Sequence, residues 1–297
     1  MSWRCLGLIV MLGPEIELVL ELARRTQDLF AGSKTTNWSM LAAETYDLET
    51  IHGIINSSTV VHVSFNTPDL TANPFPVTLP MIGVAASFDH PSSSLGEPLE
   101  IYLHGYVSSR LMNLSRQAPT PSAGADAPPS PPGLPVTISA TKVDGLVLTL
   151  TPNTHDVNYR SAVLFGYATV VTDVAEKIWA MEKITNSVLA DRWRFTRLPP
   201  DGAEMQSTSI LRVKVVGGSG KIRVGGPRDE LKDLNRDDIR DTVWTGVVPV
   251  YEYFGDPVPY KENRVKTVPD HVVSFVKEQR EQNEKYAMDA ILDESQG

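Results

Sequence analysis

The sequence predicts a mainly β protein, an antiparallel barrel or sandwich with a few helices at its margins. About seven segments look like strands, with β-branched and aromatic residues that alternate with polar ones or form short apolar runs. Over most of the chain these segments follow one another without a helix between them. A doubly wound parallel sheet needs crossover helices, so the pattern favours antiparallel pairing.

The first part of the β region predicts a helix, three strand-like runs and a short second helix. YDLETIHGIINSS is typical of a helix, because three isoleucines recur at helical spacing and two acidic residues lie in the first turn. The strand-like runs are TVVHVSF, PFPVTLPMIGVAASF and LEIYLHGYV, the last two separated by turn residues. SSRLMNLSRQ then predicts a short helix capped by Ser108 or Ser109.

A proline-rich segment at residues 117–135 interrupts the pattern. Its proline, alanine, glycine and serine content cannot supply a core, so we expect an exposed loop. Long loop insertions cost little free energy, which favours an insertion into the barrel. The alternative is a polyproline ligand for a partner module.

Beyond this loop, the sequence predicts four more strands and one amphipathic helix. The strands are VTISATKVDGLVLTLT, SAVLFGYATVV, TSILRVKVV and VWTGVVPVYEYF. The helix is DVAEKIWAMEKITNSVL, with an expected apolar stripe of Val174, Ile178, Met181, Ile184 and Val188. The GGSGK segment at 217–221 lacks the first glycine and the final Ser or Thr of a phosphate loop, so we interpret it as a hairpin turn.

The two ends of the chain predict helices outside the barrel. We divide the chain into an N-terminal helical extension (1–40), a barrel domain (41–255), and a linker with a charged helix (256–297). The extension should form a helix over residues 14–30, and the charged helix should lie on the body or on a partner subunit. The apolar stretch CLGLIVMLG is too short to span a membrane, and no signal cleavage site follows it.

Composition excludes several function classes. The 297 residues carry a net charge of -9, which argues against nucleic acid or an anionic membrane as partner. A single cysteine, Cys5, excludes an intrachain disulfide and a cysteine-based zinc site, and it fits the reducing cytoplasm. The six histidines show no metal-binding spacing, and no nucleophile elbow occurs, so we expect no metal site.

Two polar clusters are candidate anion sites. In LHGYVSSR a strand ends near His104 and a helix begins near Ser108, so Ser109 and Arg110 would join free backbone N–H groups at a helix N-terminus. This combination suits a phosphate. The alternative interpretation is an ordinary serine cap beside a surface arginine.

The second cluster is HDVNYRS, which leads into an apolar run. In an extended strand, Asn158 and Arg160 share one face, while Tyr159 and Ser161 share the other. Taken alone, the cluster could be an exposed strand end. Taken with the first cluster, Arg110 and Arg160 could meet at one doubly charged phosphate.

These motifs give the chain a family resemblance. It resembles the pyridoxamine-phosphate-oxidase-like flavoproteins, and more closely the flavin-nucleotide-binding branch with the nitroimidazole-resistance-type proteins. Four stretches between about Tyr46 and Val250 carry it, and the third is the most specific. They are YDLETIHGIINSSTVVHVSF, PFPVTLPMIGVA with LEIYLHGYVSSRLMNL, VDGLVLTLTPNTHDVNYRSAVLFGYATVV, and KIRVGGPRDE with DTVWTGVVPV.

The resemblance implies an antiparallel Greek-key split β-barrel with flanking helices, a homodimer that binds FMN at the dimer interface. Carried over by position, it assigns cofactor contacts to Pro80, Met81, His104, Gly105, Ser109, Arg110, Asn158, Tyr159, Arg160, Ser161 and Trp244.

His155 and Asp156 are the candidate catalytic residues. His155 matches the second histidine of the family's usual pair, whose first position is Thr154 here. Asp156 and Val157 replace a common serine and methionine. Because these departures lie on the expected substrate side, they leave the substrate open.

The expected function is that of an FMN-dependent oxidoreductase acting on a small organic molecule, with NAD(P)H as a candidate electron donor. Pyridoxamine phosphate is not the expected substrate, because VWTGVVPVYEYF does not restore the usual C-terminal pattern. One alternative is a non-enzymatic flavin- or haem-binding protein on the same barrel. Another is an interaction protein that uses the proline-rich loop and the C-terminal helix.

Overall fold

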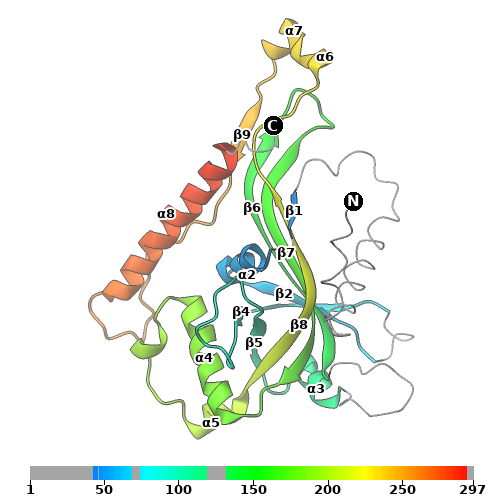
Figure 1. Ribbon diagram of the computed structural model, residues 1–297. Helices are drawn as coiled ribbons and strands as arrows, with labels where there is room; N and C mark the ends of the chain where they lie inside the picture. Colours follow the sequence, from blue (N-terminus) through cyan, green and yellow to red (C-terminus); the bar gives the residue numbers. More distant parts are fainter. Residues whose placement is uncertain (1–42, 46, 69–73, 119–131, 293–297) are drawn as a thin grey trace, which may run out of the picture.

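An antiparallel sheet forms the body of the computed structural model, which describes residues 43–45, 47–68, 74–118 and 132–292 (Figure 1). In these residues nine strands pair in the order β3-β2-β6-β7-β8-β5-β4, with β1 on β8 and β9 on β6. The strands are β1 (Ala43–Thr45), β2 (Val61–Phe65), β3 (Val77–Met81), β4 (Gly83–Ala86), β5 (Glu100–Tyr106), β6 (Leu134–Leu148), β7 (Asp156–Val170), β8 (Thr208–Arg223) and β9 (Gly246–Pro249).

The sheet closes on itself through the segment 77–86. Its first half, β3, pairs with β2, and its second half, β4, pairs with β5 at the other end of the strand order. At the bend between them, the His104 amide donates to the Ile82 carbonyl at 3.2 Å. This closure confirms the antiparallel barrel predicted from the sequence.

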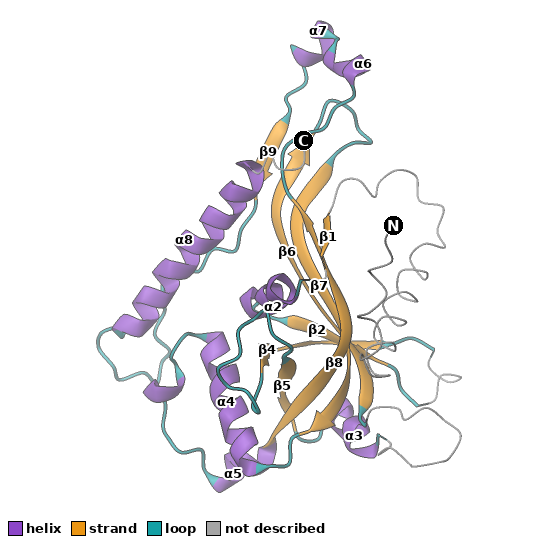
Figure 2. Cartoon of the chain, viewed as in Figure 1, coloured by secondary structure: helices purple, strands orange, loops and turns teal. Residues whose placement is uncertain are grey.

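The helices flank the barrel, as the sequence predicts, and the long strands β6, β7 and β8 continue beyond it as a curved ribbon (Figure 2). They are α2 (Leu48–Ser57), α3 (Arg110–Gln117), α4 (Val174–Val188), a 3-10 turn (Trp193–Phe195), α5 (Gly202–Ser207), α6 (Leu231–Leu234), α7 (Asp237–Arg240) and α8 (Asp270–Leu292).

The core lies inside the barrel and is built by alternation. Every second residue of β7 from Asn158 to Ala168 is buried, as expected for a strand with one face on a core. Helix α2 starts at an Asp47 cap that accepts from the Thr50 amide at 2.8 Å, and its three isoleucines join the core. Leu111 and Met112 of α3 join the same core, so α2 and α3 both anchor to the barrel.

The hairpin turn expected at 217–221 is wrong. Strand β8 runs without a break through these residues and pairs with β7 from Leu211 to Arg223, with one bulge at Phe165/Gly166. Gly218 serves close strand approach, because a Cβ there would lie 2.6 Å from the Val163 carbonyl oxygen. Glycine in a strand can mark close backbone approach as well as a turn.

The apolar stripe expected for α4 is also largely wrong. Val174, Ile178 and Val188 are exposed, whereas the buried residues of α4 are Glu176, Ala180 and Ile184. The helix turns Glu176 inward because that carboxylate accepts from the Tyr102 hydroxyl at 2.9 Å and pairs with Arg212 at 3.2 Å. Both partners lie on sheet strands, so a polar network sets the rotation of the helix.

The C-terminal helix α8 lies on the body of its own chain. Near its middle, Asn283 donates to the Glu252 carbonyl at 2.9 Å, and near its end the Ala290 carbonyl accepts from the Gly225 amide at 2.7 Å. At its start, the His271 ring stacks on Phe195 with centroids 3.8 Å apart. The first of the two placements expected from the sequence is therefore the one observed.

Other expectations fall at the edges of the described chain. The predicted helix at 14–30 and residues 119–131 of the predicted insertion lie outside the described residues. At the insertion's ends, Gln117 belongs to α3, while Leu134 and Pro135 belong to β6. No helix in the described ranges is both long and apolar enough to cross a membrane.

Candidate functional site

The first predicted cluster lies where β5 ends and α3 begins. Ser109 caps α3, because its hydroxyl accepts from the Met112 amide at 3.4 Å. Arg110 is the first residue of the helix, and its side chain is exposed. Among the residues described, none forms a hydrogen bond or an ion pair with the Arg110 guanidinium. A free cation therefore lies at a helix N-terminus, where the dipole also favours an anion.

Strand β3 brings Pro80 and Met81 to the same place. A Cβ on Gly105 would lie 3.5 Å from the Met81 side chain and 2.5 Å from that of Met112, so a side chain there would require the end of Met112 to move. We call Pro80, Met81, His104, Gly105, Ser109 and Arg110 the α3 cluster. The structure thus gathers the first group of predicted contacts around one strand end.

His104 is the titratable group of the α3 cluster besides Arg110. Desolvation lowers the pKa of His104 below its usual value of 6.5, so the imidazole is neutral at neutral pH. The positive charge of the cluster therefore comes from Arg110, and His104 offers one donor and one acceptor nitrogen.

The second predicted cluster serves α8 instead. Asn158 is fully buried, and its amide nitrogen donates to the Gly225 carbonyl at 3.0 Å and to the Ala290 carbonyl at 3.4 Å. Its carbonyl oxygen accepts from the Arg223 guanidinium. One hydrogen bond of this amide reaches the end of α8, and the other two join it to the end of β8 and to Gly225, which itself binds Ala290.

Arg160 is engaged in the same way. It forms an ion pair with Asp144 of β6 at 3.2 Å. Its guanidinium also lies over the ring of Tyr286 in α8, 3.4 Å from the ring centroid. A desolvated cation–π contact of this kind stabilises by about 2 kcal/mol. The side chain predicted to bind a phosphate is thus held between a carboxylate and an aromatic ring.

Tyr159 and Ser161 lie on the opposite face of β7, as alternation predicts. Both are half-buried, and the Ser161 hydroxyl donates to the Lys221 carbonyl at 3.3 Å. Val163, Phe165 and Tyr167 continue this face and are also half-buried. The face is therefore largely apolar, although it does not point into the barrel core.

The two catalytic candidates have partners within the chain. The carboxylate of Asp156 pairs with the Arg223 Nε at 2.7 Å. The His155 Nδ1 accepts from the Thr149 amide at 3.0 Å, which closes the turn before β7. Asp156 therefore orients Arg223, and Arg223 in turn binds Asn158.

Within one chain the two clusters do not meet. Gly105 pairs with Ser209 near the start of β8, whereas Arg160 pairs with Ile222 near its end. At about 3.3 Å per residue, the two positions lie about 40 Å apart along the strand. Figure 1 shows α3 at the lower end of the molecule and the end of α8 near β9 at the upper end. Arg110 and Arg160 of one chain therefore cannot share one phosphate.

Trp244 lies at the Arg160 end of the molecule. It lies two residues before β9, whose Gly246 pairs with Leu148 at the end of β6. Its side chain is exposed. Within one chain, Trp244 therefore lies far from the α3 cluster, just as Arg160 does.

Sequence reasoning missed Asp144, Arg223 and Tyr286, which complete the second cluster. For Asp144 a signal existed, because it continues the buried alternation of β6 opposite the start of β7. A carboxylate at a buried strand position indicates a nearby cation. For Tyr286 there was none, because its contact joins residues 126 positions apart (160 to 286).

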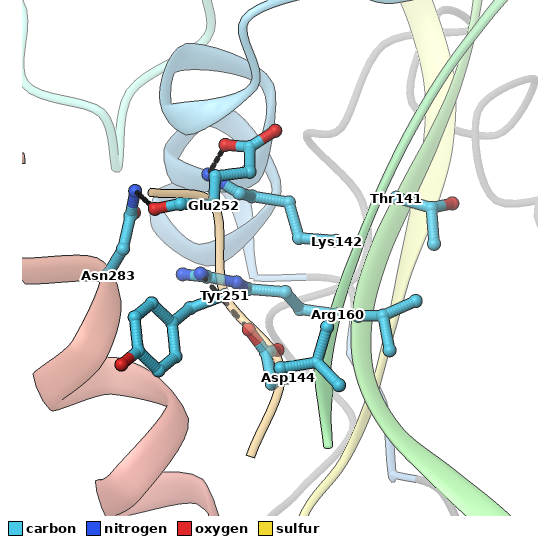
Figure 3. A pocket seen from close by; sticks show the side chains of 9 residues that line it. Thr141, Lys142, Asp144, Arg160, Tyr251, Glu252 and Asn283 are labelled. Carbon is cyan, nitrogen blue, oxygen red and sulfur yellow. Dashed lines mark hydrogen bonds and ion pairs between the residues drawn. The ribbon is translucent and has the colours of Figure 1, made fainter. Parts of the chain in front are cut away.

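A cavity of about 250 Å³ borders the second cluster (Figure 3). We call it the helix cavity, and its lining residues are Thr141, Lys142, Val143, Asp144, Arg160, Val250, Tyr251, Glu252 and Asn283. Burial raises the pKa of Asp144 above its usual value, although Arg160 and Lys142 oppose the shift.

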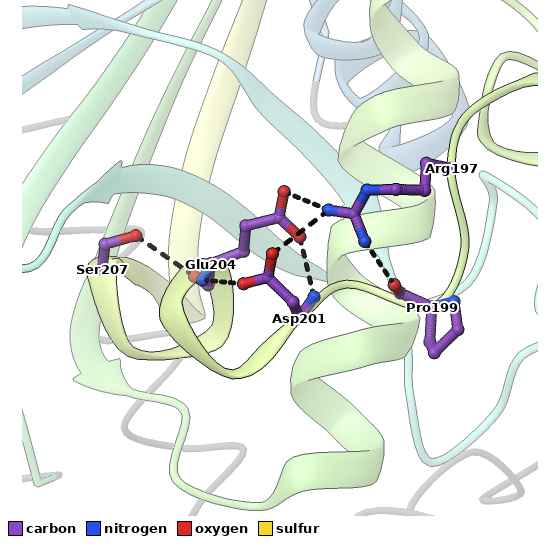
Figure 4. Close-up of polar contacts among 5 residues, drawn as sticks. All are labelled: Arg197, Pro199, Asp201, Glu204 and Ser207. Carbon is purple, nitrogen blue, oxygen red and sulfur yellow. Dashed lines mark hydrogen bonds and ion pairs between the residues drawn. The ribbon is translucent and has the colours of Figure 1, made fainter.

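Another charged cluster, at α5, is structural. Asp201 and Glu204 form a reciprocal capping box, and Arg197 pairs with both carboxylates (Figure 4). The hydrogen bond from Arg197 lowers the pKa of Glu204. All three side chains are exposed, so the cluster stabilises the start of a short helix.

In the described ranges, no group of three or more His, Cys, Asp or Glu could hold a metal ion.

Comparison with known proteins identifies a family. The sequence model of the pyridoxamine 5'-phosphate oxidase family matches residues 47–222, which run from α2 to β8 and include the α3 cluster and residues 155–161. The match ends before Trp244 and α8. No curated protein matches the sequence.

Two solved structures share the fold over most of their length. Flavocytochrome Anf3 from Azotobacter vinelandii superposes with a TM-score of 0.61 and 22% identity, over 81% of this chain and 94% of its own. The FAD and heme binding protein from Mycobacterium smegmatis superposes with a TM-score of 0.60 and 21% identity, over 78% and 96%. At these identities the likeness establishes the fold.

Proposed function

Because the chain belongs to the pyridoxamine 5'-phosphate oxidase family, we propose that it binds a flavin nucleotide at the α3 cluster and acts as an oxidoreductase. FMN is the proposed cofactor and a small organic molecule the proposed substrate, with NAD(P)H as electron donor. The single cysteine fits a cytoplasmic location.

The observation that supports this function best is the free Arg110 beside the Ser109 cap. A phosphate at this point would accept hydrogen bonds from the first backbone amides of α3 and from the guanidinium. Gly105 leaves no side chain on the neighbouring strand end, where a Cβ would collide with Met112. The residues present therefore fit a flavin phosphate.

The flavin would supply hydride or electron transfer when bound. The protein's own part is to hold and orient it. Arg110 and the amides of α3 would fix the phosphate, and Pro80 and Met81 would place backbone against the ring. Neutral His104 can donate or accept one hydrogen bond there without adding charge.

We propose that the flavin site is completed by a second copy of the chain. Tyr159, Ser161 and Trp244 lie at the opposite end of the molecule from Arg110, so they could reach the same flavin only from a partner. The half-buried apolar face of β7 supports this, because a monomer would bury such a face or make it polar. A homodimer would cover this face and join the two ends.

The second candidate function is flavin or haem binding without catalysis. Both structural neighbours are described as binding haem, one as a flavocytochrome and one as an FAD and heme binding protein. In this chain the neutral imidazole of His104 is the form that ligates iron. Haem would lie at the same strand end as the flavin phosphate.

Absorption spectroscopy and FMN titration of the purified protein test the proposal. We expect a flavin spectrum, and we expect Arg110→Ala to weaken FMN binding about 10- to 100-fold through the lost charged hydrogen bonds. Arg194→Ala, which removes an exposed arginine far along the chain, is the matched control and should change nothing. Unchanged FMN affinity in Arg110→Ala would exclude a phosphate at α3.

Two further readouts separate the candidates. Oxidation of NAD(P)H by the FMN-loaded protein distinguishes an enzyme from a carrier. A Soret band on addition of haem, lost in His104→Ala, would favour the haem-binding function. Titration with FAD beside FMN decides which nucleotide the site accepts.

A further inference from the structure

The helix cavity shares no residue with the α3 cluster. It lies between β6, β7, residues 250–252 and α8. Its volume of about 250 Å³ far exceeds the space that one water needs. It is close to the lower limit of small-molecule pockets, which start at roughly 300 Å³.

Charges of both signs line this cavity. The Lys142 ammonium pairs with Glu252 at 2.9 Å, and Arg160 pairs with Asp144 at 3.2 Å. The side chain of Asp144 is only 5% exposed and that of Lys142 9%. In Figure 3, Arg160 extends from β7 between Glu252 above and Asp144 below. Two cations and two carboxylates therefore surround one small space.

Hydrogen-bonding capacity is left over in these walls. The Arg160 Nε–H is buried and has no partner among the residues described. The ring of Tyr286 covers the face of the guanidinium and leaves its edges for hydrogen bonds. Asn283 donates to the Glu252 carbonyl, and no described residue donates to its side-chain oxygen. Buried polar groups normally have partners, and the Arg160 Nε–H lacks one.

The arrangement of charge selects the class of ligand. A doubly charged phosphate would approach two carboxylates as well as two cations, and an apolar ligand would leave the polar groups unpaired. A small molecule with one carboxylate and one ammonium group satisfies both signs at once.

We propose that the helix cavity binds a small zwitterion of about the size of an amino acid. Its carboxylate pairs with Arg160, and its ammonium group pairs with Asp144 and Glu252. Helix α8 supplies Asn283 to the same site, so the ligand also bridges α8 to the sheet. This site goes beyond the proposed flavin function and does not depend on it.

Calorimetric titration of the full-length protein with alanine tests the proposal. We expect saturable binding of alanine, and binding at least tenfold weaker for acetate, ethylammonium and inorganic phosphate, which each carry one sign of charge. Saturable binding would also slow hydrogen exchange in α8.

Two neighbouring variants of α8 locate the site. Asn283 lines the cavity, whereas the exposed Gln282 beside it does not. Asn283→Leu removes the amide without touching the ion pairs, so we expect alanine binding to weaken at least tenfold. Gln282→Leu should bind alanine like the wild type. Circular dichroism of both variants confirms that they fold.

Three results would overturn the proposal. They are no saturable alanine binding to the folded wild type, equal binding by Asn283→Leu, and phosphate binding at least as tight as alanine binding. The flavin function is tested separately: Arg110→Ala should lose FMN but keep alanine, and Asn283→Leu should lose alanine but keep FMN.

Discussion

Asp144 is a carboxylate that the fold buries beside two cations. Its pairing with Arg160 offsets the loss of hydration only in part, because burial raises the pKa of Asp144 above its usual value of 3.8. The cost of removing the Asp144 carboxylate from water therefore exceeds the free energy that its ion pair returns, as is common for buried ion pairs.

This shift makes a testable prediction about pH. Between the usual value of 3.8 and the raised pKa, the folded chain binds a proton at Asp144 more readily than the unfolded chain does. The contribution of Asp144 to the free energy of unfolding therefore increases as pH falls through this window and levels off below it. Asp144→Asn removes this contribution, and urea unfolding of both proteins between pH 7 and pH 4 measures it.

The control for this experiment is Asp289→Asn, because Asp289 is an exposed partner of Lys285 on α8. The difference in unfolding free energy between wild type and Asp144→Asn should shift in favour of the wild type as pH falls. A difference that stays constant, or shifts the other way, would contradict the raised pKa.

At this scale the sequence predicts faces but not their partners. Alternation correctly placed Asn158 and Arg160 on one face of β7 and Tyr159 and Ser161 on the other. It could not show that α8 contacts the first face, because strand periodicity carries no information about a helix more than a hundred residues away. The local signal for the α3 cluster was stronger, since a strand end and a helix cap adjoin there in the sequence.

Strand β8 shows the same limit for a whole element. A glycine-rich segment is typical of a turn, yet here it lies within the continuous β7–β8 pairing, and Gly218 lets the two strands approach closely. The two uses of glycine look alike in sequence and differ only in what a Cβ would meet. Likewise, helical spacing gave the period of α4 but not its rotation, which Glu176 sets through Tyr102.

Two glycine variants distinguish a continuous strand from a turn. A Cβ at Gly218 would lie 2.6 Å from the Val163 carbonyl oxygen, so Gly218→Ala should destabilise by about 1–3 kcal/mol. A Cβ at Gly217 meets nothing within 4 Å, so Gly217→Ala should change stability by no more than about 0.5 kcal/mol. Urea unfolding of both variants measures the contrast, and equal effects would argue against the strand.

At the scale of the molecule, the residues that the resemblance assigns to one flavin divide between two ends. The α3 cluster lies beside the start of β8, whereas Tyr159, Ser161 and Trp244 lie toward the end of that strand. A site that needs both ends must draw them from two copies. The sequence could name the residues but not this division, which depends on the length and register of β8.

A mixed dimer tests whether the site is shared. We expect Arg110→Ala and Trp244→Ala homodimers each to bind FMN weakly, because every site lacks one contact. In a dimer with one chain of each variant, one site would contain both mutations and the other would be intact. Differently tagged chains allow its purification, and fluorescence titration should then give about one FMN per dimer at wild-type affinity. If each chain formed its own site, both sites would remain defective, and no wild-type affinity would return.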